Sequence, residues 1–143
     1  MSVLPDIRQL LSNATDASGA LKTNSSGGGT PLTGSSGNVA ATATTATLAA
    51  AVGKTTYITG FTVTGAGATA GSAILVTVTG LIGGTATYVV TVAAGATVAT
   101  PTLSVNFTTP VPASTTNTAI VVNVPSFGVG NTNAAVVATG YQL

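Results

Sequence analysis

Apolar and polar side chains alternate with a period of two in six short runs between residue 55 and the C-terminus. The runs cover residues 55–64, 73–79, 85–92, 103–109, 118–124 and 134–141. A period of two with one apolar face is typical of half-buried antiparallel strands. The faces expected to point into the core carry Tyr57, Thr59, Phe61 and Val63; Ile74, Val76 and Val78; Ala86, Tyr88, Val90 and Val92; Leu103, Val105 and Phe107; and Ile120, Val122 and Val124.

Glycine or proline marks the interval between successive runs, as at residues 83–84 and 110–112. Proline has no backbone N–H to donate within a central strand, so Pro110 and Pro112 predict a loop that crosses between strands. The number and spacing of the runs predict an all-β fold, namely an antiparallel β-sandwich or jelly roll of seven or eight short strands.

Two stretches of low complexity precede these runs. Residues 39–48 are rich in threonine, which favours strands, and in alanine, which does not. Because a strand run follows, we predict a strand over 39–48 and a β-sandwich domain over 39–143. Residues 23–38 are rich in glycine and serine, with Leu32 as the one aliphatic side chain, and this composition predicts a flexible linker.

The first 22 residues differ from the rest and predict an N-terminal anchoring arm. The apolar side chains within this arm fall at helical spacing, and Pro5 suits a first helical turn, so we expect a short helix over residues 5–11. An isolated helix of this length is marginal in water and needs a surface to pack on. Either the arm docks on another protein, or it frays or folds back on its own domain. The residues that would anchor it are Val3, Leu4, Ile7, Leu10 and Leu11.

Charge and composition narrow the function classes. The charged residues are Asp6, Arg8, Asp16, Lys22 and Lys54, and the chain contains no histidine and no cysteine. No basic cluster can bind a nucleic-acid backbone or a membrane surface, and no run of about 18 residues is apolar throughout. Disulfides, thiolate metal sites and histidine-based catalysis are excluded. We therefore expect no enzyme activity, no catalytic or metal-binding residues, no cofactor, no nucleic acid and no membrane partner.

A nearly uncharged surface also bears on assembly. Soluble monomers usually carry mixed charges for colloidal stability. A chain without them must cover its surface with hydroxyl and amide groups or bury it against partners. We expect an oligomer, and the alternative is a monomer solvated by hydroxyl groups alone.

Several short segments of the C-terminal part resemble small structural proteins of tailed bacteriophages. They are YITGF at 57–61, PVPAS at 110–114 followed by NTAIVV at 117–122, GVGNTNA at 128–134 and the terminal GYQL. The resemblance is to capsid decoration proteins, head-fibre proteins and short tail-fibre modules. It implies a β-sandwich or jelly-roll domain, commonly a homotrimer, displayed on a virion that is assembled in the host cytoplasm.

Two functions follow as expectations. In the first, the protein decorates or cements a phage capsid, and its arm docks on the major capsid protein or another virion protein. In the second, it is a tail-fibre or head-fibre module that contacts a host surface glycan through loops such as 65–71 and 111–117. Phe127, beside Gly128, is the aromatic residue most open to exposure, although it could instead plug the end of the sandwich.

Overall fold

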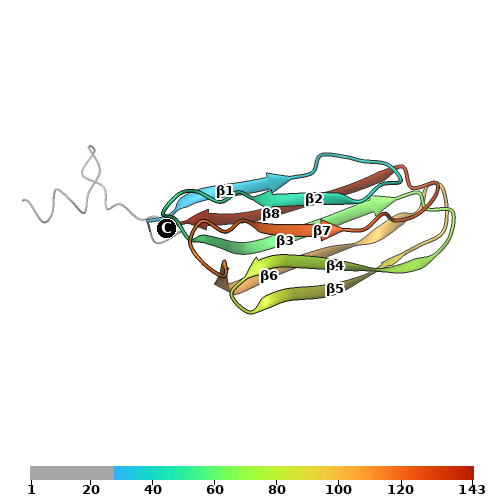
Figure 1. Ribbon diagram of the computed structural model, residues 1–143. Helices are drawn as coiled ribbons and strands as arrows, with labels where there is room; N and C mark the ends of the chain where they lie inside the picture. Colours follow the sequence, from blue (N-terminus) through green and yellow to red (C-terminus); the bar gives the residue numbers. More distant parts are fainter. Residues whose placement is uncertain (1–27) are drawn as a thin grey trace, which may run out of the picture.

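The computed structural model describes residues 28–143, and in this part of the chain eight strands form two antiparallel sheets of four (Figure 1). The strands, in chain order, are β1 (Thr30–Ser35), β2 (Thr44–Leu48), β3 (Thr56–Ala66), β4 (Ser72–Leu81), β5 (Gly84–Val92), β6 (Ala99–Pro112), β7 (Ile120–Val124) and β8 (Asn133–Gln142). One sheet has the order β1-β8-β3-β6 and the other the order β2-β7-β4-β5.

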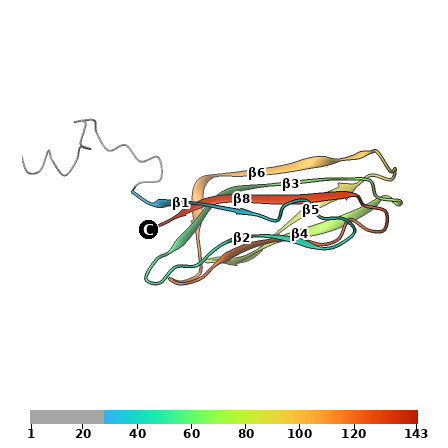
Figure 2. The same cartoon turned by 90° about the horizontal axis from the view of Figure 1, so that it is seen from above.

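The pairing of the strands is that of a jelly roll. Antiparallel pairs join β1 to β8, β2 to β7, β3 to β6 and β4 to β5, as in one long hairpin whose tip is the turn between β4 and β5. Rolling this hairpin brings β8 beside β3 and β7 beside β4, which completes the two sheets. Figure 2 shows the resulting two layers. The all-β prediction of a β-sandwich or jelly roll is confirmed.

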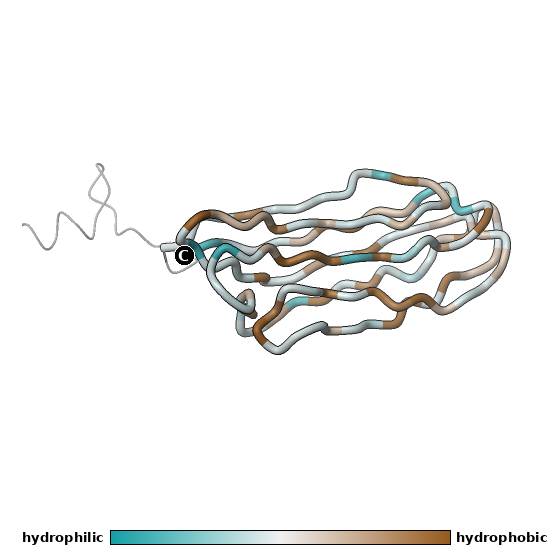
Figure 3. Tube along the Cα trace, viewed as in Figure 1, coloured by the Kyte–Doolittle hydropathy of each residue, from teal (hydrophilic) through white to brown (hydrophobic). Residues whose placement is uncertain are grey.

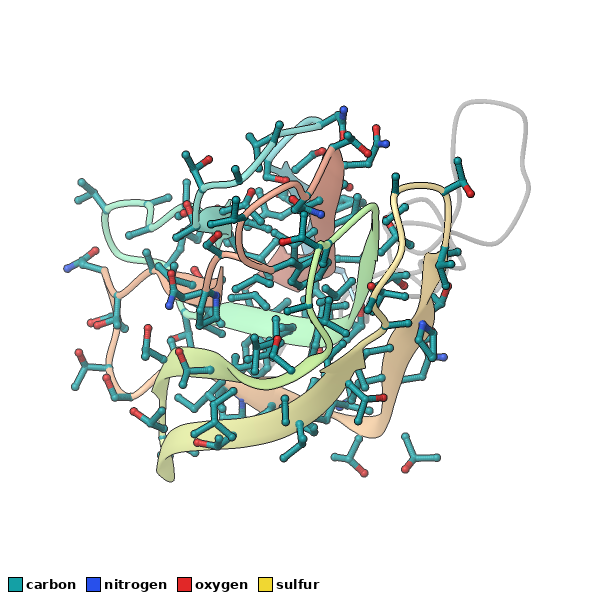
Figure 4. The ribbon with its side chains drawn as sticks, turned by 90° about the vertical axis from the view of Figure 1, so that its right-hand side faces the viewer. Carbon is teal, nitrogen blue, oxygen red and sulfur yellow. The ribbon has the colours of Figure 1, made fainter. Side chains whose placement is uncertain are left out.

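The core lies between the two layers and is built from the inward face of each strand. In β7, Ile120, Val122 and Val124 are fully buried, whereas Val121 and Asn123 between them are only half-buried. Side chains fill the space between the sheets, and apolar positions alternate with polar ones along the strands (Figures 3 and 4). Full burial of one such aliphatic side chain stabilises a fold by about 1.5–3 kcal/mol.

The predicted facing of Tyr57 and Thr59 is wrong. The register of β3 against β8 shifts between Ile58 and Gly60, and this bulge inverts the alternation. Ile58 before the bulge and Phe61 after it are buried, so Tyr57 and Thr59 point to the outer face of the sheet.

The predicted linker over 23–38 is wrong where β1 lies, because Thr30–Ser35 pairs along β8 as an edge strand. A Cβ added at Gly34 would overlap the carbonyl oxygen of Thr47 in β2, so β1 and β2 lie in close contact. The strand predicted over 39–48 begins only at Thr44, since Ala41 adopts a positive φ of 53° that an extended strand does not allow. Residues 23–27 and the predicted arm lie outside the described residues.

The loop predicted around Pro110 and Pro112 is instead the end of β6. This strand lies at the edge of its sheet, where a missing N–H costs no ladder bond. Ile58 pairs with Val111 and Gly60 with Asn106, so residues 107–110 bulge opposite one residue of β3. Beyond the bulge the strand reaches the second sheet, since Ala113 bridges to Leu81.

Candidate functional site

The predicted anchor residues Val3, Leu4, Ile7, Leu10 and Leu11 lie outside the described residues, but the structure shows at which end of the sandwich the described chain begins. Thr30, near the first described residue, pairs with Gln142, and Thr55 exchanges two backbone hydrogen bonds with Leu143. Residues 1–27 therefore join the sandwich at the end where the C-terminus lies (Figure 1). We call this the arm end, and the opposite end the distal end.

Three large apolar residues are exposed in the loops of the arm end. Val52 is 94% exposed, Ile82 is 65% exposed and the C-terminal Leu143 is 45% exposed. The exposed Lys54 lies in the same loops and is the single charged side chain between residues 28 and 143. The arm end thus offers apolar contact area beside one cation.

Hydrogen bonds fix these loops on the body of the sandwich. Asn117 takes a positive φ of 62°, accepts the Gly53 N–H at 2.6 Å through Oδ1, and donates its own N–H to the Lys54 carbonyl at 2.9 Å. The Ile82 N–H donates to the Pro112 carbonyl at 3.0 Å. Hydrogen bonds therefore fix the backbone that carries the exposed side chains of the arm end.

Gln142 ties the loop after β2 to the end of β8. Its Nε2 donates to the Ala49 carbonyl at 2.7 Å and to Oγ1 of Thr56 at 3.3 Å, and Thr56 in turn donates to Ala49. Both side chains are buried, and burial makes each of these bonds costly to lose. These hydrogen bonds fix the start of the loop that carries Val52.

Two tyrosines stack on the outer face of the β1-β8-β3-β6 sheet, close to the arm end. Tyr57 and Tyr141 pair across β3 and β8, with ring centroids 5.0 Å apart and planes 9° apart. Pro31 pairs with Tyr141 and Pro112 pairs with Tyr57, so a proline stands beside each ring in the same cross-strand row. Each ring covers one face of the other, so only the outer face of each ring is available to stack on a sugar.

The loops predicted to touch a glycan do not meet. Residues 65–71 lie at the distal end, next to Ala134, whereas residues 111–117 lie at the arm end beside Tyr57. Phe127 is buried at 1% exposure and plugs the distal end, so the interpretation as a plug is confirmed and the exposed one is wrong. The exposed large apolar residues of the distal end are Val129, at 80%, and Val98, at 43%.

The outer face of the β2-β7-β4-β5 sheet carries mainly threonine, and its most exposed large apolar residues lie on β4 and β5. Leu75 in β4 and Val89 in β5 are 55% and 60% exposed, and they pair directly across the two strands. The alternation already placed both residues on the polar face. Their contact could not be predicted, because it depends on the register between β4 and β5.

Some features are absent from residues 28–143. This part of the chain encloses no pocket and holds no cluster of three or more metal-ligating side chains. It also has no helix that is both long and apolar enough to cross a lipid bilayer. Comparisons with models of protein families, with curated proteins and with solved structures found no match for this chain.

Proposed function

We propose that this chain is a structural virion protein that decorates or cements a phage capsid, with the arm end turned toward the capsid. The observation that carries the proposal is the difference between the two ends of the molecule. The arm is attached at the same end as the exposed residues Val52, Ile82 and Leu143. The apolar residues of the arm and the exposed apolar area of the sandwich can therefore contact the same partner. The major capsid protein is the partner we propose, and the resemblance to phage structural proteins supports the virion as its location.

The neutral surface of the sandwich supports an assembly role on physical grounds. Burying a charge in a contact requires it to be desolvated and paired, whereas apolar and hydroxyl groups avoid that cost. The part of the contact made by the sandwich itself contains only Lys54 as a charged side chain, so that part is little affected by salt, since ion pairs are what salt screens. Such contacts suit a particle that meets changing media. We retain a homotrimer as the expected oligomer.

A second candidate, a head-fibre or tail-fibre module that binds a host glycan, has one observation in its favour. Val129, flanked by Gly128 and Gly130, is 80% exposed at the distal end, which is the part farthest from the arm. A module anchored by its arm would present this end to a host. The stacked pair Tyr57 and Tyr141, however, lies near the arm end, where it suits contact with the particle better than with a receptor.

The test is binding of a truncated chain to particles that lack the protein. Deletion of residues 1–22 removes the arm and leaves every described strand, so we expect a folded, soluble β-domain that no longer binds the particle. Circular dichroism checks the fold, and co-sedimentation with particles checks binding. A control variant replaces the five arm residues Val3, Leu4, Ile7, Leu10 and Leu11 with serine and should lose binding equally. Retained binding by the truncated chain would refute the anchoring role.

A further inference from the structure

The four edge strands of the two sheets differ in how well they are protected. An exposed edge offers free N–H and C=O groups to another strand, and proteins usually block it with charge, proline, a bulge or short length. β2 has five residues and β1 has six, with a proline in β1, and the two edges lie against each other. β6 carries three prolines, Pro101, Pro110 and Pro112, and a bulge.

β5 is the least protected of the four edges, because its one register shift against β4 lies at the turn, between Gly84 and Ala86. Its nine residues contain no proline and no charged side chain. Seven consecutive pairs with β4, from Ser72 with Val92 to Val78 with Ala86, run without a register shift, so the edge is straight over residues 86–92. Among the edges of the described sheets, β5 is therefore the one open to a further strand.

Apolar side chains flank this edge on both faces of the sheet. On the outer face, Val89 on β5 stands directly beside Leu75, and more than half of each side chain is exposed. On the inner face, Tyr88 of β5 and the apolar positions of β6 across the seam are only partly buried. Leu103, Val105 and Phe107 are these positions of β6. A strand added at β5 would cover apolar area on both sides.

We propose that β5 pairs with β5 of a second copy of this chain, antiparallel and about a two-fold axis at Val89. This register pairs all seven residues of the straight segment, because Ala86 meets Val92 of the second copy and Thr87 meets Thr91. It also aligns Leu75 and Val89 with the same two residues of the second copy in one apolar row. The near absence of charge in the described residues means that no like charges oppose the contact.

A second copy is the occupant that this edge fits best, because the contact closes on itself. A two-fold interface uses the same strand of both copies and leaves no open edge. The joined sheet has eight strands and ends on β2 of each copy, which is short and covered by β1. The contact cannot by itself form a trimer. If the proposed homotrimer also forms through another surface, and its three-fold axis meets this two-fold axis at a right angle, the closed assembly contains six copies.

Disulfide trapping tests the register in the full 143-residue chain, which has no cysteine of its own. A Val89→Cys variant should form a disulfide-linked dimer on mild oxidation, since facing residues of an antiparallel pair have the Cα separation that a disulfide requires. The matched control, Thr47→Cys, places the thiol on the outer face of β2, the edge strand on the other side of the same sheet, and should stay monomeric on a denaturing gel. Equal cross-linking of the two variants would overturn the proposal.

Mass measurement by light scattering tests the contact without cross-linking. We expect an even number of copies, two or six, for the unmodified chain. Val89→Lys should halve that mass with an unchanged circular dichroism spectrum, because Val89 is 60% exposed and lysine at an edge opposes strand addition. Thr47→Lys should leave the mass unchanged. An odd number of copies, or a Val89→Lys variant with the unmodified mass, would overturn the proposal, and neither result depends on where the protein is located.

Discussion

The ring of Phe127 packs directly on the backbone of Gly65, and together they close the distal end of the sandwich. A Cβ added at Gly65 would overlap Cε2 and Cδ2 of the Phe127 ring. Phe127 is 1% exposed and is among the largest fully buried side chains of the described core. The glycine in β3 is therefore required for close approach and not for a special backbone conformation.

Replacing Gly65 with alanine should destabilise the fold by about 1–3 kcal/mol, because the added methyl group forces the Phe127 ring out of its place. Urea unfolding followed by circular dichroism measures the loss. Gly83→Ala is the control, since a Cβ at Gly83 meets no atom within 4 Å. Equal stabilities of the two variants would show that Phe127 does not depend on Gly65.

Val122→Asp should destabilise by about 4 kcal/mol or more, because Val122 is 0% exposed and the new carboxylate would be buried without a partner. Val137→Asp is the comparison, since Val137 is 38% exposed on the outer face of β8 and the charge there remains in water. Thermal unfolding of both variants is the measurement. An unchanged melting temperature for Val122→Asp would contradict the inward facing of β7.

Asn131→Ala should destabilise the fold by about 2–3 kcal/mol, since the buried Asn131 side chain loses three part-buried hydrogen bonds at the distal end. The Asn131 Nδ2 donates to the carbonyls of Ala66 at 2.7 Å and Asn133 at 2.8 Å, and its Oδ1 accepts the Ala41 N–H at 3.2 Å. Asn38→Ala removes only an exposed bond to Asn133 and should change the free energy of unfolding by less than about 0.5 kcal/mol. Chemical denaturation distinguishes the two, and similar values would refute the role of Asn131.

Serine at Val52, Ile82 and Leu143 should weaken binding to the particle without changing stability, because these side chains are exposed at the arm end. The matched control places serine at Val98 and Val129, which are exposed at the distal end. Co-sedimentation with particles measures binding, and thermal unfolding checks the fold. If the distal variant loses binding and the arm-end variant retains it, the proposed orientation on the particle is reversed.

Most of the fold could be predicted from the alternation of side chains, and the errors have identifiable physical causes. β1 has one aliphatic side chain, Leu32, and its other inward position is Gly34, so its composition resembles that of a linker. The inversion at Tyr57 arises from a bulge near Gly60, which depends on pairing with β8. Pro110 is compatible with β6 because that strand is an edge and bulges at residues 107–110.

The candidate sites were less predictable because they depend on contacts between distant parts of the chain. Tyr57 and Tyr141 are 84 positions apart in the sequence (141 − 57), and they stack only because β3 and β8 pair in this register. The pairing of Leu75 with Val89 likewise depends on the register between β4 and β5. Composition alone indicated that the surface is neutral and suited to assembly, but it could not place Val52 and Ile82 together at the arm end.

The copy number of the protein in purified virions is the measurement that decides whether it decorates a capsid. Quantitative mass spectrometry against the major capsid protein supplies it. For a decoration or cement protein we expect copies in a fixed proportion to the capsid lattice. A few copies per particle would contradict that role and indicate a fibre, and absence from purified virions would contradict the virion function altogether.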